Sequence, residues 1–74
     1  MPDQTEWEEK VSRLLKAELK RQGVTYAGLV DKLADIGIEE KQANVANKLS
    51  RGKFSAAFML QCLSVLAVDT LHLR

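Results

Sequence analysis

Residues 39–66 read EEKQANVANKLSRGKFSAAFMLQCLSVL, and this stretch decides the fold because one glycine, Gly52, divides it into two segments of opposite character. In the first segment, small or apolar residues recur every three positions on one side of a helix whose other side is polar: Ala43, Ala46 and Leu49. The second segment is apolar nearly all round, which is typical of a helix at the centre of a domain or at an interface. We therefore predict one helix over about 39–51 and another over about 55–66.

Two more helices are predicted before this stretch. Apolar residues recur at helical spacing near the start of the chain: Trp7, Val11, Leu14, Leu15 and Leu19. Thr25 is a favourable N-cap for a second apolar run: Leu29, Val30, Leu33 and Ile36. These patterns predict helices over about 5–22 and 25–36. Gly28 inside the second helix costs about 1 kcal/mol relative to alanine, so we expect it to pack closely against a neighbouring element.

The tail over residues 68–74 alternates apolar and polar side chains, as a short strand does. Such a strand needs a partner strand, for example from a second copy of the chain, and the alternative is a tail packed on the first helix. The sequence as a whole predicts an all-α, compact bundle of four main helices that forms a single domain over residues 1–74. A core of this size supplies only about 3–5 kcal/mol, so we expect a homodimer.

The residue types argue against catalysis. The 74 residues contain one histidine, His72, and one cysteine, Cys62, and neither has the spacing to other ligands that a metal site needs. No serine lies in a nucleophile-elbow motif or near a residue that could act as its general base. Cys62 lies inside an apolar run, where a buried, unreactive thiol is expected. We therefore expect no enzyme, no catalytic residue, no metal, no cofactor and no small-molecule substrate.

The chain also lacks the patterns of targeting and membrane insertion. Its first residues are acidic and have no apolar run behind them, unlike a secretory signal or a transit peptide. No apolar stretch approaches the ~18 residues of a membrane span. The expected setting is the cytoplasm, with no membrane partner.

Charge is sorted along the chain although the formal net charge is only +1. Residues 1–9 carry four acidic side chains and no basic one, which gives a local charge of −4. Residues 10–21 and 41–53 each carry a local charge of +4. The second basic stretch coincides with the polar side of the predicted third helix, and this coincidence is the sharpest functional signal in the sequence.

That polar side carries side chains able to bind base edges: Gln42, Asn44, Asn47 and Lys48. Amide groups can bond adenine bidentately, lysine can bond guanine, and a helix fits the major groove of DNA. Glu39 and Glu40 at the predicted start of this helix oppose the idea, because their carboxylates would repel phosphates. The simplest alternative is a polar helix face that serves only to contact water.

The chain resembles a known class of DNA-binding domain in four segments: Gly23-Val24-Thr25, Leu29 to Leu33, Lys48 to Lys53 and Leu60 to Val68. Over residues 15–68 the order of elements resembles the lambda-repressor and Cro type of helix-turn-helix domain. The resemblance implies a helix-turn-helix core formed by the second and third helices, double-stranded DNA as the partner, and a role in transcription regulation. Both of these helices are longer than in that family by close to one turn.

A second resemblance is more specific and covers most of the chain. The stretches 14–20 and 50–58 are similar to those of a small uncharacterised bacterial domain family. This resemblance implies a bacterial source and a stand-alone domain, and it carries no activity.

We therefore expect a small, dimeric protein that reads double-stranded DNA as a bacterial transcriptional regulator. The base-edge candidates are the four given above, and the remaining candidates would contact phosphates: Thr25, Tyr26, Lys41, Arg51 and Lys53. The alternative is a protein-interaction module of the same fold, which uses the apolar fourth helix or the C-terminal strand and binds no DNA. An RNA-binding helical domain is a third possibility.

Overall fold

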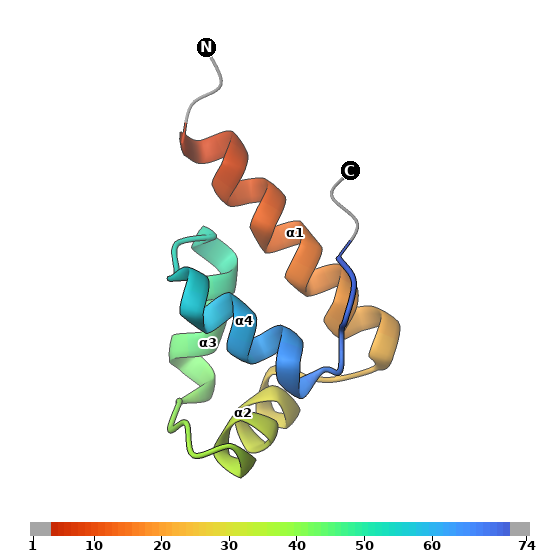
Figure 1. The fold of residues 1–74 in the computed structure, drawn as a ribbon. Coiled ribbons are helices and arrows are strands. Elements are labelled where there is room, and N and C mark those ends of the chain that lie inside the picture. Colours follow the sequence, from red (N-terminus) through yellow and green to blue (C-terminus); the bar gives the residue numbers. More distant parts are fainter. Residues whose placement is uncertain (1–3, 72–74) are drawn as a thin grey trace.

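The computed structural model describes residues 4–71, which form four helices joined by short connections (Figure 1). The helices are α1 (Gln4–Gln22), α2 (Tyr26–Asp35), α3 (Gln42–Arg51) and α4 (Ala56–Val65). Within the described residues there is no strand, so the predicted all-α bundle of four main helices is confirmed. None of the helices over residues 4–71 has the length and apolar composition that a membrane span requires.

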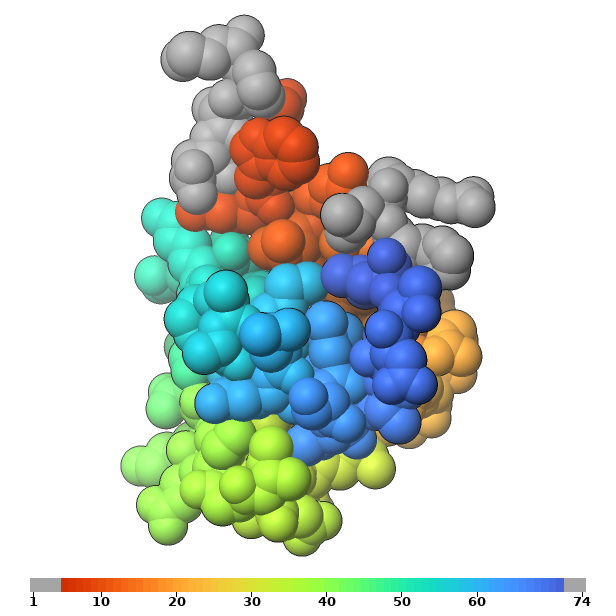
Figure 2. All heavy atoms as spheres, viewed as in Figure 1, coloured from red at the N-terminus to blue at the C-terminus, as the bar shows by residue number. Residues whose placement is uncertain are grey.

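All four helices contribute to one apolar core. Its buried members are Leu15, Leu19, Leu29, Leu33, Val45, Leu49, Phe58, Cys62, Leu63 and Leu66. Helix α1 packs against α3, and α2 packs against both α3 and α4. Figure 2 shows α4 and the chain that follows it across the middle of the viewed face, with α2 below them. Because burial of these side chains removes apolar surface from water, this core is the main source of stability.

Local capping sets the starts of α2 and α4. The Thr25 hydroxyl accepts a hydrogen bond from the Gly28 amide at 3.0 Å, and the Ser55 hydroxyl accepts one from the Phe58 amide at 3.0 Å. These bonds satisfy amides that have no partner inside the helix. The Gly28 amide therefore serves the cap, and a Cβ at this position would meet only the side chains of Val24 and Thr25, each at 3.4 Å. The expectation that Gly28 packs against a neighbouring element is wrong.

The predicted start of the third helix is also wrong. Helix α3 begins at Gln42 rather than near residue 39. The Ile38 amide bonds back to the Leu33 carbonyl at 3.0 Å, and the Ile38 side chain packs against the core. This anchor holds the end of α2, so residues 39–41 form the non-helical connection that brings the chain to α3.

Two contacts hold helix α1 against the end of α3, and each of them involves main-chain atoms. The hydroxyl of Ser12, which is buried, donates a hydrogen bond to the carbonyl of Leu49. One turn earlier, the backbone of Glu8 lies so close to Gly52 that a Cβ on the glycine would lie 3.0 Å or less from three Glu8 atoms. Gly52 also has φ +69°, the left-handed conformation that glycine adopts without strain.

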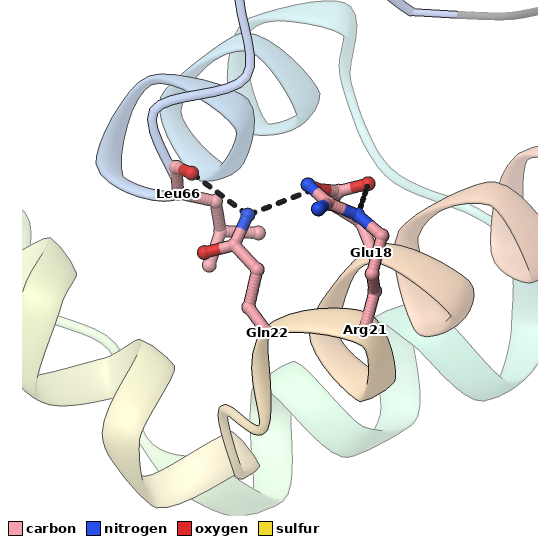
Figure 3. A network of polar contacts seen from close by, with 4 residues as sticks. All are labelled: Glu18, Arg21, Gln22 and Leu66. Atoms are coloured by element: carbon pink, nitrogen blue, oxygen red, sulfur yellow. Dashed lines mark hydrogen bonds and ion pairs between the residues drawn. The ribbon is translucent and has the colours of Figure 1, made fainter.

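The last turn of α1 is tied to the end of α4 (Figure 3). The Gln22 side-chain amide donates to a carboxylate oxygen of Glu18 and to the Leu66 carbonyl, both at 2.8 Å. Arg21 forms an ion pair with the same carboxylate. The hydrogen bonds from Arg21 and then Gln22 lower the pKa of Glu18 below its ordinary value.

Residues 68–71 show no strand, which was one of the two alternatives that the sequence left open for the tail. Val68 and Leu71 instead pack partly buried against the core, and the Val68 amide bonds to the Leu63 carbonyl at 2.9 Å. Residues 72–74, which include His72, lie outside the described part of the chain.

Candidate nucleic-acid interface

The face of α3 that points away from the core is polar and contains no carboxylate. Val45 and Leu49 have no exposed surface and define the buried side, whereas the predicted buried side had Ala43 and Ala46 beside Leu49. Ala43 is exposed and Ala46 is half-buried. The error arises because positions four apart also share a helix face. The exposed face consists of Ala43, Asn44, Asn47, Ser50 and Arg51.

Three of the four predicted base-edge residues are exposed on this helix. Asn44 and Asn47 lie on the outward face, and Gln42 is exposed in the first turn. Within residues 4–71 the structure shows no hydrogen bond to any of the three side-chain amides. Their donors and acceptors are therefore available to a partner.

Lys48, the fourth candidate, is turned away from the outward face. Its Nζ lies 2.7 Å from a carboxylate oxygen of Glu40 and 4.4 Å from the centre of the Phe58 ring. The Lys48 side chain is 34% exposed and that of Glu40 only 13%. The pair removes one of the two acidic charges that opposed DNA binding in the sequence, and Glu39 remains exposed.

Three predicted phosphate-binding residues lie at the two ends of α3. Lys41 is the exposed N-cap and makes no capping hydrogen bond with its side chain. Arg51 is the last residue of α3, and Lys53 follows the glycine that ends it. Arg51 and Lys53 share a shallow depression with Asn47 and Lys48. The structure thus places the cationic side chains of Arg51 and Lys53 next to the exposed amide of Asn47.

Thr25 and Tyr26, the other two phosphate candidates, lie at the start of α2 and line a different depression. Two lysines from α1, Lys16 and Lys20, line it with them. These lysines were not identified as site residues, although they belong to the first basic stretch of the sequence. Charge alone could not assign them, because their position beside α2 depends on how the chain turns after α1.

The other reactive groups within residues 4–71 do not gather into a second site. Within the described residues, no three histidine, cysteine or acidic side chains gather where a metal ion could bind. The Cys62 side chain has no exposed surface. Burial raises the pKa of the Cys62 thiol to about 11, and the carboxylate of Glu40 adds to the rise.

Comparison with known proteins gives one match. A protein-family model described as "Domain of unknown function (DUF6471)" matches residues 7–71. No curated protein and no solved structure matches the chain significantly. The family match confirms the resemblance to an uncharacterised domain family, whereas the resemblance to the lambda-repressor and Cro type stays a prediction.

Proposed function

We propose that this chain, which belongs to the domain-of-unknown-function family DUF6471, binds double-stranded DNA with α3 in the major groove. The observation that carries the proposal is the outward face of α3, which offers two unpaired amides and a guanidinium and no carboxylate. A face of this kind can approach a polyanion without electrostatic repulsion. Regulation of transcription in a bacterium is the biological role that we infer.

The side chains divide into two kinds of contact. Gln42, Asn44 and Asn47 can bond base edges, and an amide pairs bidentately with adenine. Lys41, Arg51 and Lys53 flank them at the ends of the helix and can hold phosphates. The base contacts would give sequence preference, and the cations would give most of the affinity.

The neighbouring helix supports the same orientation. Helix α2 packs on α3, and the connection between them is residues 36–41, so we propose that the pair acts as a helix-turn-helix. The depression lined by Lys16, Lys20, Thr25 and Tyr26 would hold a further phosphate. We infer a binding protein without catalytic activity or a cofactor, because this chemistry needs only hydrogen bonds and charge.

An anisotropy titration tests the proposal directly. We expect labelled random-sequence duplex to bind at about 50 mM salt and to lose affinity steeply by about 200 mM, because counterions are released on binding. Arg51→Glu should lower the affinity at least about tenfold, whereas Lys32→Glu, an equal charge change on the exposed side of α2, should change it far less. Absence of binding by the unaltered protein at the lower salt concentration would reject the proposal.

The second candidate function is a protein-interaction module, and one observation favours it. Leu60 of α4 is 65% exposed, and Ala56 and Ala57 beside it are exposed too. These residues form an uncharged patch on which a second copy could pack, so we propose a homodimer. The two functions are compatible, because a dimer can read two DNA half-sites about 34–36 Å apart. Varying the salt concentration distinguishes dimerisation from DNA binding, because apolar association depends far less on ionic strength than DNA binding does.

A further inference from the structure

The ammonium group of Lys48 is held by two elements besides its own helix. Glu40 belongs to the connection between α2 and α3, and Phe58 belongs to α4, where only 4% of its surface is exposed. The ion pair at 2.7 Å and the cation–π contact at 4.4 Å act on the same charged group. Lys48 therefore joins three parts of the bundle at the base of the proposed DNA-binding face.

This geometry is unsuited to reading a base. To reach a base edge, the Lys48 ammonium would have to leave both Glu40 and the Phe58 ring. Its departure would leave a carboxylate that is 13% exposed without its counter-ion, next to Lys41 at the start of α3. A partly buried, unpaired carboxylate is costly, and near DNA it also repels phosphates.

We propose that Lys48 is a positioning residue of the DNA interface, an inference that rests on the proposed function. Lys48 cancels the charge of Glu40 and fixes residues 39–41 against α3 and α4. The DNA then meets the exposed amides and cations of α3 with no acidic charge from Glu40. The residue thus contributes to affinity without touching the nucleic acid.

The proposal makes the effect of Lys48 depend on Glu40. Lys48→Met keeps the aliphatic chain over Phe58 and exposes the Glu40 charge, so DNA affinity should fall about three- to tenfold. Glu40→Gln alone should retain at least the affinity of the unaltered protein. The double variant should return to within about twofold of Glu40→Gln, because no carboxylate is left to neutralise.

Direct contact of Lys48 with DNA gives a different result. Lys48→Met would then lower DNA affinity by the same factor whether or not the protein also carries Glu40→Gln. The slope of log affinity against log salt concentration would also become shallower by about one. Lys53 and Glu39 provide the matched control. Both are exposed and no ion pair joins them in the described chain, so Lys53→Met and Glu39→Gln should act additively.

Anisotropy titrations of all variants, with thermal unfolding to verify that each is folded, decide between these outcomes. A loss that Glu40→Gln does not recover, or no loss on Lys48→Met, overturns the role of Lys48 while DNA binding by the unaltered protein stands. If the unaltered protein does not bind DNA, the proposed function fails and the inference fails with it.

Discussion

Gly52 is the residue on which the junction between α1, α3 and α4 depends. Its left-handed φ ends α3, its amide bonds to the Lys48 carbonyl at 2.9 Å, and its missing Cβ leaves room for the backbone of Glu8. The sequence predicted the first role, since glycine is the usual residue just after a helix. It could not predict the second, because the approach of Glu8 is a contact between residues far apart in the chain.

Substitution of Gly52 separates these two roles. Gly52→Ala should lower the free energy of unfolding by about 3 kcal/mol or more, because it combines left-handed strain with a collision against main-chain atoms. Gly23→Ala is the matched control: Gly23 has φ +68° and open space around it, so only about 1–2 kcal/mol of strain is expected. Urea denaturation measures both values, and equal losses would show that the contact with Glu8 is unimportant.

Cys62 should make stability depend on pH in the alkaline range. The ordinary thiol pKa is 9.0 and that of the folded protein is about 11, so between these values the unfolded chain loses a proton that the folded chain keeps. The raised pKa of Cys62 therefore contributes fully to the free energy of unfolding below pH 9, and this contribution is lost as the pH rises through 11. Thermal midpoints of the unaltered protein and of Cys62→Ala should converge over this range, whereas parallel curves would contradict the shift.

At the scale of the elements, hydrophobic spacing and glycines predicted that four helices exist, but not where all of them begin. Helix α3 starts at Gln42 because Ile38 is fixed in the core, and this anchor is a tertiary contact. The buried side of α3 was also misassigned. The sequence allows one apolar side with Ala43, Ala46 and Leu49 and another with Val45 and Leu49, and the small alanines do not identify which side is buried. Glu40 lies in the non-helical connection before α3, so its contact with Lys48 is not described by residue spacing in a continuous helix.

Helix α2 contains an unnecessary glycine. A Cβ at Gly28 would lie in ordinary contact, at 3.4 Å, with the side chains of Val24 and Thr25. Gly28→Ala should therefore raise the free energy of unfolding by about 0.5–1 kcal/mol, since alanine favours the helical backbone. The Thr25 cap bond uses the Gly28 amide and survives the change. Thermal unfolding tests the sign, and a lower midpoint would mean that the Val24 side chain cannot move aside.

At the scale of the whole molecule, the position of charge is more informative than its sum. The chain has a net charge of +1, yet the outward face of α3 has no acid, while α2 exposes Asp31 and Asp35. Helix α4 has no charged residue at all. The sequence predicted this segregation, because local charge can be counted along a chain. It did not predict that Lys48 would point away from the outward face of α3 and neutralise Glu40.

The uncharged patch on α4 leads to a prediction about assembly. Two copies related by a two-fold axis bring identical residues together, so a patch without charge avoids self-repulsion. We expect the protein to sediment as a dimer and Leu60→Glu to sediment as a monomer. Ile36→Glu, which alters another exposed apolar residue, 53% exposed at the end of α2, should remain dimeric. A monomeric unaltered protein would exclude this interface.

The two side-chain ties of α1 also have a consequence for protein synthesis. Ser12 bonds a residue 37 positions later, and Gln22 bonds one 44 positions later. Of these four helices, α1 leaves the ribosome before the others, and α3, its main packing partner, and the end of α4 are made afterwards. The apolar side of α1 therefore stays without these partners until α3 and the end of α4 have been made, and the native packing of α1 is completed only when α4 is present.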